Sequence, residues 1–384
     1  MNLKRVFEVA RKEWREIIRD RLFFSLAFVV PAFLMILFGY GISLDVENIP
    51  FVVVDNDGSV MSRDYAYRFI DSRYFDFKGY THDEHILTSL LTDNKVRAAI
   101  IIPEHFQKNL LKDRPVHVQT LIDGTFPFRA QTTKGYVTAI NAAMSRELLA
   151  RYLSRTRGIT LEQAQRIVQP VKLEARYLYN QSLKSIWSVA PKLIMVIMML
   201  SPPFLTALGV VREKESGSIY NIYASTIRRG EFLLGKLAPY VAISTMNMLI
   251  LWLTATQLYG APFKGQVAFF TLASILYVIC TTGIGLVASV FVRTQIAAMI
   301  VTIILTMVPA VLYSGMLIPI ASLSGQAQVI AHILPAMYYT NIVTGTFLKG
   351  VGLNFLWPNV LILAAYAIVL FTIGFTLFSK RPRS

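Results

Sequence analysis

Six long apolar stretches recur along the 384-residue chain, separated by polar segments. A bilayer core of about 30 Å is crossed by a helix of roughly 20 apolar residues. The pattern therefore predicts six transmembrane helices. They are expected at Leu22–Ile42, Val189–Val210, Leu237–Tyr259, Val267–Val292, Ile296–Ile318 and Trp357–Phe378.

Apolar residues also recur at helical spacing ahead of the first stretch, while the opposite face is almost entirely charged. They are Leu3, Val6, Phe7, Ala10, Trp14, Ile17 and Ile18. This pattern predicts an amphipathic helix within residues 1–21 that lies in the headgroup layer. The alternative is an N-terminal helix that packs on other protein.

Residues 43–185 have a different pattern, in which short β-branched runs alternate with helical spacing. Strands are expected at Ile49–Val54, Phe75–Tyr80, Ala98–Ile102 and Val116–Ile122. Helices are expected at Ser62–Ser72, Glu84–Thr92, Glu104–Lys112 and Arg129–Thr156, with one more after the capping box at Thr160–Gln163. Repeated strand–helix alternation indicates an α/β domain.

Composition supports the membrane interpretation. The chain is 54% hydrophobic and 16% charged, whereas a soluble protein is about 25% charged. Its one cysteine, Cys280, excludes an intrachain disulfide and a cysteine-based zinc site. The net charge of +15 could suggest a nucleic-acid partner. In a membrane protein such an excess marks cytoplasmic flanks, so no nucleic acid is expected.

The distribution of lysine and arginine orients the chain. Basic residues crowd the N-terminal segment, the loop after the second span and the C-terminal tail, whereas the short loops on the other side contain only Lys264 and Lys349. Both termini are therefore expected in the cytoplasm. The predicted fold is an α-helical integral membrane protein with six transmembrane helices, plus an α/β extracytoplasmic domain between the first and second spans.

Two motifs resemble binding sites but lack the necessary context. Gly230–Lys236 matches the start of a phosphate-binding loop, but Leu237 stands where Ser or Thr should hold Mg²⁺, and no strand precedes it. The run His82–His85 offers four potential metal ligands at a probable helix start, where acids usually serve the helix dipole. We therefore expect no metal, no cofactor and no catalytic residue in this chain.

The six predicted spans contain no Asp, Glu or His, and Lys192 is their one clearly intramembrane charge. This lysine either extends to the headgroups or serves a transport path. Ion-coupled carriers place carboxylates near the bilayer midplane. Their absence indicates that the energy for any transport comes from another component.

Several local motifs occur together in a specific order. They are Lys12-Glu13, Arg19-Asp20-Arg21, Phe38–Gly41, Val53–Asp57, Ile102–Phe106, Arg212–Ser218, Leu234–Lys236, and then Gly315, Pro319, Pro335, Tyr338 and Tyr339. In this order the chain resembles the permease subunit of a type-2 ATP-binding-cassette (ABC) exporter, from the multidrug-efflux branch with a large extracytoplasmic domain.

The resemblance implies the type V exporter fold. Its parts would be an interfacial helix at residues 1–21, a first transmembrane helix at 22–42, an extracytoplasmic domain at 43–185 and a five-helix region at 186–384. The permease would pair with a second copy or a related permease and with separate ATPase subunits that bind ATP and Mg²⁺. A periplasmic membrane-fusion adaptor and membrane lipid are further expected partners, and the bacterial inner membrane is the expected location.

The resemblance also assigns candidate sites. The loop 212–236 would transmit force from the ATPase through Arg212, Glu213, Glu215, Gly217 and Ser218. The segment 319–356 would form a re-entrant cap that includes Pro319, Pro335, Tyr338 and Tyr339. The second and fifth spans would line the exit path. Residue chemistry adds flexible methionines there as substrate contacts, with ordinary packing as the alternative; these are Met195, Met198, Met199 and Met307.

The expected function is export of drug-like or amphipathic substrates, driven by ATP that a partner chain hydrolyses. A lipid or glycan exporter of the same class is an alternative. A membrane-anchored receptor or assembly platform, with a ligand-binding outer domain, is an alternative of another class.

Overall fold

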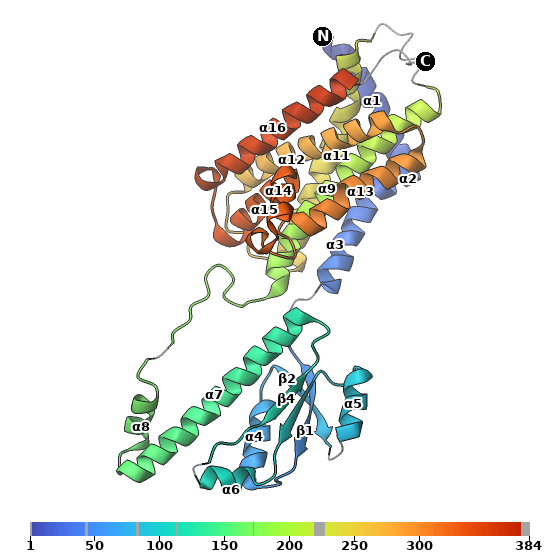
Figure 1. Cartoon of the computed structure of the whole chain (residues 1–384). Helices are drawn as coiled ribbons and strands as arrows, with labels where there is room; N and C mark the ends of the chain where they lie inside the picture. Colours follow the sequence, from blue (N-terminus) through green and yellow to red (C-terminus); the bar gives the residue numbers. More distant parts are fainter. Residues whose placement is uncertain are drawn as a thin grey trace. The chain divides into compact units, whose positions relative to one another are not determined.

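The computed structural model describes residues 2–42, 45–81, 84–112, 114–171, 173–218 and 227–377. Contacts divide the chain into two units, each of which is visible in Figure 1. The helical unit comprises Met1–Leu44 and Tyr177–Ser384, and the α/β unit comprises Asp45–Arg176.

Six helices among the described residues are long and apolar enough to cross a membrane. The first, Arg21–Gly41, joins α2 (Arg21–Phe24), a π-helical turn (Ser25–Val29) and α3 (Val30–Gly41). The others are α9 (Ser185–Glu215), α11 (Arg229–Leu253) with a π-helical turn (Thr254–Leu258), α12 (Val267–Phe291), α13 (Gln295–Tyr313) and α16 (Leu353–Leu377). The six expected spans are therefore confirmed as helices.

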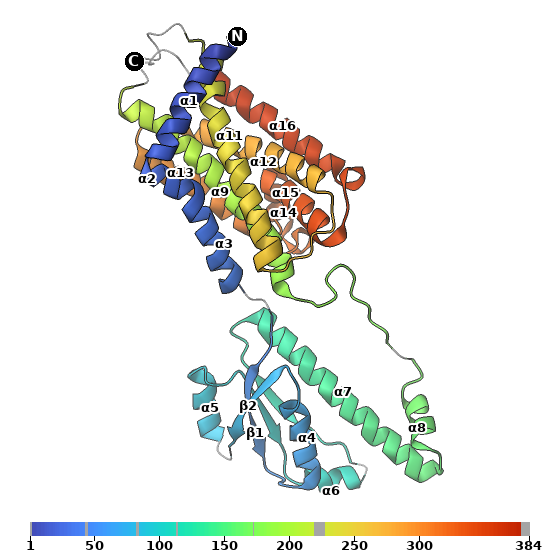
Figure 2. The same ribbon diagram turned by 180° about the vertical axis from the view of Figure 1, so that it is seen from behind.

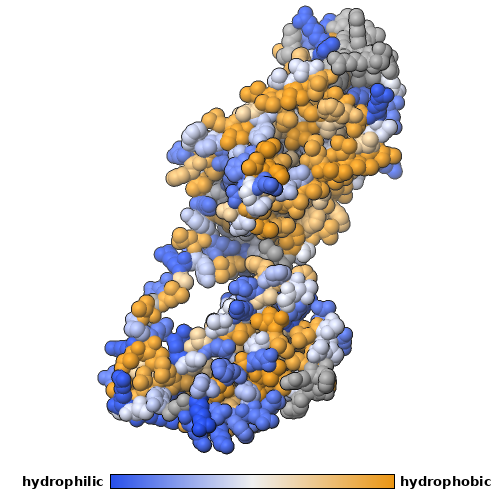
Figure 3. All heavy atoms as spheres, viewed as in Figure 1, coloured by the Kyte–Doolittle hydropathy of each residue, from blue (hydrophilic) through white to orange (hydrophobic). Residues whose placement is uncertain are grey.

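The second of these helices, α9, forms the centre of the helical unit. Its most apolar stretch is 89% buried, compared with 22% for α13 and 17% for α16. Figure 3 shows the consequence, a broad hydrophobic surface over the helical unit. Side chains that would be unfavourable in water are thus presented outward, as in a protein solvated by lipid.

Local turns and caps set the helix ends, and one end differs from the expected boundary. The fifth span ends at Tyr313 rather than Ile318, because Gly315 turns the chain with φ +79°. Only residues 292–294 connect α12 to α13, and the Thr294 side chain caps α13 by accepting from the Ala297 N–H. Residues between α13 and α16 form a 3₁₀ turn (Ile320–Ser322), α14 (Gly325–Ile333), α15 (Pro335–Thr344) and a π-helical turn (Gly345–Lys349).

A separate helix, α1 (Leu3–Arg19), precedes the first span. Its apolar face remains exposed within this chain: Leu3 is 73% and Phe7 64% accessible. A neighbouring face that includes the buried Glu13 and Ile17 packs on the protein, and Figure 2 shows α1 beside α11. The helix therefore combines both expected arrangements, a face that packs on protein and an apolar face left outward.

The α/β unit is built on a four-stranded sheet in the order β2-β1-β3-β4. The strands β1 (Ile49–Asp55), β2 (Phe75–Tyr80) and β3 (Ala98–Ile102) are parallel, and β4 (Gln119–Ile122) is antiparallel to β3. The helices are α4 (Val60–Ile70), α5 (Glu84–Thr92), α6 (Phe106–Leu111), α7 (Pro127–Arg157) and α8 (Leu161–Val168).

Helices cover both faces of this sheet, which explains the continuous apolar run of β1. Phe51 and Val53 pack with residues of α4, α6 and α7, whereas Val52 and Val54 pack with Leu87 of α5. The expected α/β unit is thus present. Its fourth strand is shorter than expected, because Val116 and Val118 pack on the core ahead of the ladder.

Candidate functional site

A buried cluster of charges joins α1, α9 and α11. Glu13 of α1, Glu213 of α9 and Lys236 of α11 are 4%, 6% and 1% exposed. The Lys236 Nζ lies 2.8 Å from Glu13 Oε2 and 3.2 Å from Glu213 Oε1. The Tyr240 hydroxyl donates a hydrogen bond to the other Glu13 oxygen. Three helices that are distant in the sequence therefore share one ion cluster.

A fourth residue, Lys12, closes the cluster toward solvent. Its Nζ lies 3.2 Å from Glu213 Oε1 and 3.6 Å from Glu16 Oε1. Burial alone would lower the pKa of Lys12, but the charges of Glu213 and Glu16 outweigh burial and raise it. The lysine therefore stays protonated and binds α1 to the end of α9.

Two glycines create the space that the cluster needs. A Cβ on Gly235 would lie 2.7 Å from both the Val6 carbonyl oxygen and the Val9 Cβ, so only glycine lets α1 approach α11 this closely. A Cβ on Gly209 would overlap the Tyr240 hydroxyl. The helical stripe Val9, Glu13 and Ile17 then faces the protein.

The energetic consequence follows from burial. A buried ion pair adds little net stability, but removing one partner leaves an uncompensated buried charge and costs about 3–5 kcal/mol. Glu213 Oε2 has no hydrogen-bond partner among the described residues. A displacement of one of the three helices would therefore disturb the ion pairs that the other two helices make in this cluster.

An outer ion pair continues the same junction. Arg212 Nη1 lies 2.6 Å from Asp20 Oδ2, at the bend between α1 and the first span. Burial would raise the pKa of Asp20, but hydrogen bonds from Arg212 and from the backbone N–H groups of Phe23 and Leu22 lower it. The carboxylate is thus charged at neutral pH and helps fix the exit from α1.

The structure places the expected coupling residues at the end of α9. Arg212, Glu213 and Glu215 lie in the last turn, and Gly217 turns the chain with φ +74°. Glu215 accepts hydrogen bonds from the Gln295 backbone and side chain, each at 3.0 Å, and not from a basic group. Ser218 is the last residue before 219–226, which lie outside the described residues, as do His82 and Asp83.

The sequence interpretation missed Glu13, Lys236 and Tyr240 as a unit. The sequence interpretation placed Lys236 in the cytoplasmic loop 212–236. In the structure it lies inside α11, and the whole of Gly230–Lys236 is helical. That helix also explains why this motif forms no phosphate cradle. One signal in the sequence could have identified Glu13. It lies four residues after Val9 and four before Ile17, so the three side chains share one face of the helix, and that face packs on the protein.

The carboxylates of Glu13, Glu16 and Glu213 are close enough to share a metal ion. In this structure the ammonium groups of Lys12 and Lys236 occupy that place. Each of the three acids therefore has a lysine of this chain as an ion-pair partner.

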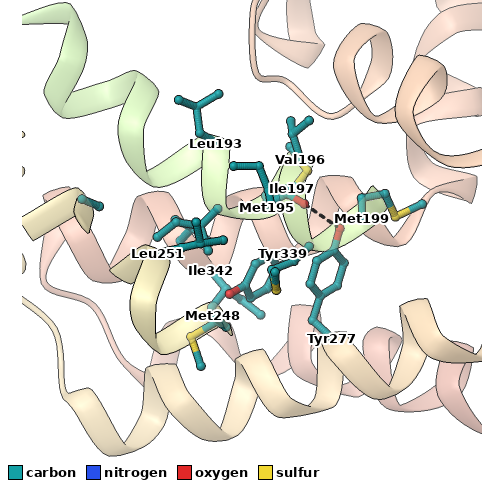
Figure 4. Close-up of a cluster of buried hydrophobic side chains, with 14 of the residues drawn as sticks. Leu193, Met195, Val196, Ile197, Met199, Met248, Leu251, Tyr277, Tyr339 and Ile342 are labelled. Carbon is teal, nitrogen blue, oxygen red and sulfur yellow. Dashed lines mark hydrogen bonds between the residues drawn. The ribbon is translucent and has the colours of Figure 1, made fainter. Parts of the chain in front are cut away.

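The expected substrate contacts lie in two settings. Met195, Met198 and Met199 are buried in the core of this chain. Figure 4 shows Met195 and Met199 among side chains of neighbouring helices, with the Tyr277 hydroxyl donating to the Met195 carbonyl at 3.3 Å. All three therefore pack within this chain, and their role as substrate contacts stays a prediction. Met307 is half-buried on the largely exposed α13.

Residues of the expected cap contact the helical core. Pro335 begins α15, and the Tyr339 ring stacks on Tyr277 with centroids 4.0 Å apart. The Tyr338 hydroxyl donates to the His332 carbonyl at 2.9 Å, which ties α15 to α14. Pro319 precedes the 3₁₀ turn. The segment therefore forms two short helices packed on the bundle rather than a seventh span.

Comparison with known proteins gives the family. The model of the ABC-2 family transporter protein matches residues 21–376. The probable multidrug ABC transporter permease YbhS of Escherichia coli K12 is 27% identical over 384 residues, covering 100% of this chain and 98% of that protein. The probable multidrug ABC transporter permease YbhR of the same organism is 25% identical over 364 residues, covering 94% and 95%. The inner membrane transport permease YhhJ, also from this strain, is 24% identical over 383 residues, covering 99% and 98%. The match along almost the whole chain confirms the resemblance: this protein belongs to the ABC-2 family of transporter permeases.

Proposed function

We propose that this chain is the membrane-spanning subunit of an ABC exporter that moves drug-like or amphipathic compounds out of the cytoplasm or inner membrane. A separate ATPase subunit binds ATP and Mg²⁺ and hydrolyses the nucleotide. Two relatives carry the word multidrug in their names, which supports this substrate class. Family membership favours a transporter over a receptor or an assembly platform.

The buried cluster of Glu13, Glu213 and Lys236 is the observation that supports mechanical coupling between the ATPase and the membrane-spanning helices. It joins the interfacial helix α1 to the last turn of α9 and the first turns of α11. These two helix ends border the residues 219–226, which lie outside the described residues, within the segment 212–236 that in this proposal touches the ATPase. A displacement of the loop would move α9, and α9 contacts α12, α13 and α15.

The proposed assembly is a dimer of permeases with both termini in the cytoplasm of a bacterium. The α/β unit would lie on the periplasmic side, where a membrane-fusion adaptor could bind it. The exposed apolar residues of α13 support a second permease or lipid as its neighbour. In this arrangement α14 and α15 would cap the path on the outer side.

Transport by the reconstituted complex tests this function. The permease and its ATPase are placed in vesicles, and the ATP-dependent movement of a fluorescent amphipathic dye is measured together with ATP hydrolysis. We expect dye movement with ATP and none with a non-hydrolysable analogue. An active ATPase that moves none of a panel of drugs, lipids and glycans would overturn the exporter assignment.

A further inference from the structure

Lys192 of α9 is a charged group that the proposed coupling does not use. It lies near the start of α9, at the opposite end of that helix from Glu213. The separation is about 30 Å at the 1.5 Å rise per residue of a helix. Its side chain is half-buried, and it has no carboxylate partner among the described residues. An ionisable group within a membrane-spanning helix generally marks a functional site.

The contacts of Lys192 leave its charge uncompensated. Its Nζ donates to the Gly315 carbonyl at 3.3 Å and to the Met316 carbonyl at 3.4 Å, just beyond the end of α13. Both distances are long for a charge-assisted hydrogen bond, which is usually 2.7–2.9 Å. An ammonium has three donors, so one has no acceptor among the residues that the structure describes.

The surrounding chain supplies no anion. The helical unit contains no Asp or Glu in the segments 36–44, 177–200, 250–270 and 310–356, which form this end of it. The same segments contribute Lys184, Lys192, Lys264 and Lys349. Lys264 is exposed and donates to the Tyr179 carbonyl at 3.0 Å, whereas the half-buried Lys192 side chain reaches from α9 to the backbone just beyond α13. This end of the unit is therefore positive and without an internal counter-ion.

We propose that Lys192 binds the acidic group of an amphiphile, a carboxylate or a phosphate monoester or diester, at the contact of α9 with the end of α13. The proposal rests on the proposed export function, because it names the chemical class that this path prefers. The anion could belong to the transported compound or to a resident phospholipid, since both present the same chemistry to the ammonium. The acidic group would replace the two weak carbonyl contacts with an ion pair in a medium of low dielectric constant.

Direct binding tests the site without the ATPase. The purified chain in dodecyl maltoside is heated with dodecyl phosphate or with uncharged 1-dodecanol, and the melting temperature is recorded. We expect dodecyl phosphate to raise the melting temperature of the wild type and of Lys192→Arg but not of Lys192→Gln. Lys264→Gln is the matched control and should respond as the wild type does. An equal response of Lys192→Gln and the wild type would overturn the site.

A second measurement links the site to export and identifies the source of the anion. ATP hydrolysis by the reconstituted complex is measured in phosphatidylcholine vesicles with either compound. We expect half-maximal stimulation at an about tenfold lower concentration of dodecyl phosphate than of 1-dodecanol, equivalent to ~1.4 kcal/mol, and loss of this preference in Lys192→Gln. Lys192-dependent stimulation by phosphatidylglycerol vesicles alone would assign the anion to lipid.

The two proposals fail in different ways. A complex that hydrolyses ATP but moves no compound, together with an intact melting shift, would contradict export but keep the anion site. Lys192→Gln could instead lower the melting temperature of the unliganded chain and weaken both compounds equally. That result would show that Lys192 only caps the end of α13, and it would overturn the anion site while leaving export intact.

Discussion

At the scale of single residues, the cluster of Glu13, Glu213 and Lys236 contains two acids for one deeply buried cation. Lys236 bonds both acids, whereas Lys12 reaches Glu213 from a half-exposed position. The four residues are therefore not equivalent. Removing Lys236 leaves two buried carboxylates facing one another, whereas neutralising Glu213 leaves each lysine with another acid, Glu13 or Glu16.

This asymmetry predicts a large effect for Lys236→Met. We expect a loss of about 3–5 kcal/mol in the free energy of unfolding, because the acids lose their buried counter-ion. Reversible denaturant unfolding in mixed micelles measures it. The control Lys264→Met removes an exposed lysine and should change stability by less than about 0.5 kcal/mol. Similar losses in both variants would show that the buried cluster contributes no special stability.

A second prediction concerns Asp123 in the α/β unit. Hydrogen bonds from the Thr125 side chain and backbone, and then from Arg97, lower the pKa of Asp123 from 3.8 to about 2. A lowered folded-state pKa contributes stability above the unfolded value, and this contribution is lost as the pH falls. Amide hydrogen exchange of the full chain should show that the contacts around β4 loosen between pH 3.8 and about 2. In Asp123→Asn this pH dependence should be absent, and its persistence would assign it to another carboxylate.

At the scale of elements, much of the fold could be predicted from periodicity. The strand Ala98–Ile102 and the helix Glu84–Thr92 match expectation to the residue, because each run is bounded by turn or polar residues. The π-helical turns at Ser25–Val29 and Thr254–Leu258 were not predicted, since apolar composition carries no information on hydrogen-bond register.

The candidate site was predicted only in part, because local sequence patterns carry no information on contacts between distant segments. Glu213 was expected because the resemblance assigns the coupling role to residues in the loop 212–236. Its partners Glu13 and Lys236 lie more than 200 residues from each other, and no local pattern pairs them. The close approach that joins them depends on Gly235, whose role is visible only when α1 and α11 are placed together.

The glycine gives an element-scale prediction. Gly235→Val should force α1 away from α11, because a side chain there meets the Val6 backbone at 2.7 Å. We expect amide exchange in Leu3–Arg19 to accelerate about tenfold or more, as its contacts are lost. The control Gly135→Val lies in α7, where an added Cβ meets nothing within 4 Å. Unchanged exchange of α1 in Gly235→Val would contradict the close packing.

At the scale of the whole molecule, the proposed orientation in the membrane rests on the distribution of lysine and arginine along the chain. The proposal places Lys4 of α1 in the cytoplasm and Glu104 of the α/β unit outside. In a background where Cys280 is replaced by Ala, an impermeant thiol reagent added to intact cells should label Glu104→Cys and leave Lys4→Cys unlabelled. The reverse labelling pattern would invert the proposed topology.

The last prediction concerns transmission between the ATPase and the bundle. Glu213→Gln preserves side-chain shape and leaves Lys236 paired with Glu13 at 2.8 Å and Lys12 paired with Glu16 at 3.6 Å, so no buried ammonium loses its only acid. The variant should therefore fold and retain basal ATP hydrolysis in the reconstituted complex. It should nevertheless lose most substrate stimulation, because Glu213 no longer ties the end of α9 by charge to Lys12 of α1 and Lys236 of α11.

The matched control is Glu215→Gln, two residues further along the same helix. Glu215 is exposed and, within the described part of the chain, accepts only from Gln295, so its loss leaves the three-helix junction intact. ATP turnover with and without a transported dye separates the two variants. Because exposed polar contacts contribute little while buried charge pairs resist displacement, stimulation should survive in Glu215→Gln and fall in Glu213→Gln. Normal stimulation in both would place the transmission outside this cluster, in the loop itself or at another contact with the ATPase.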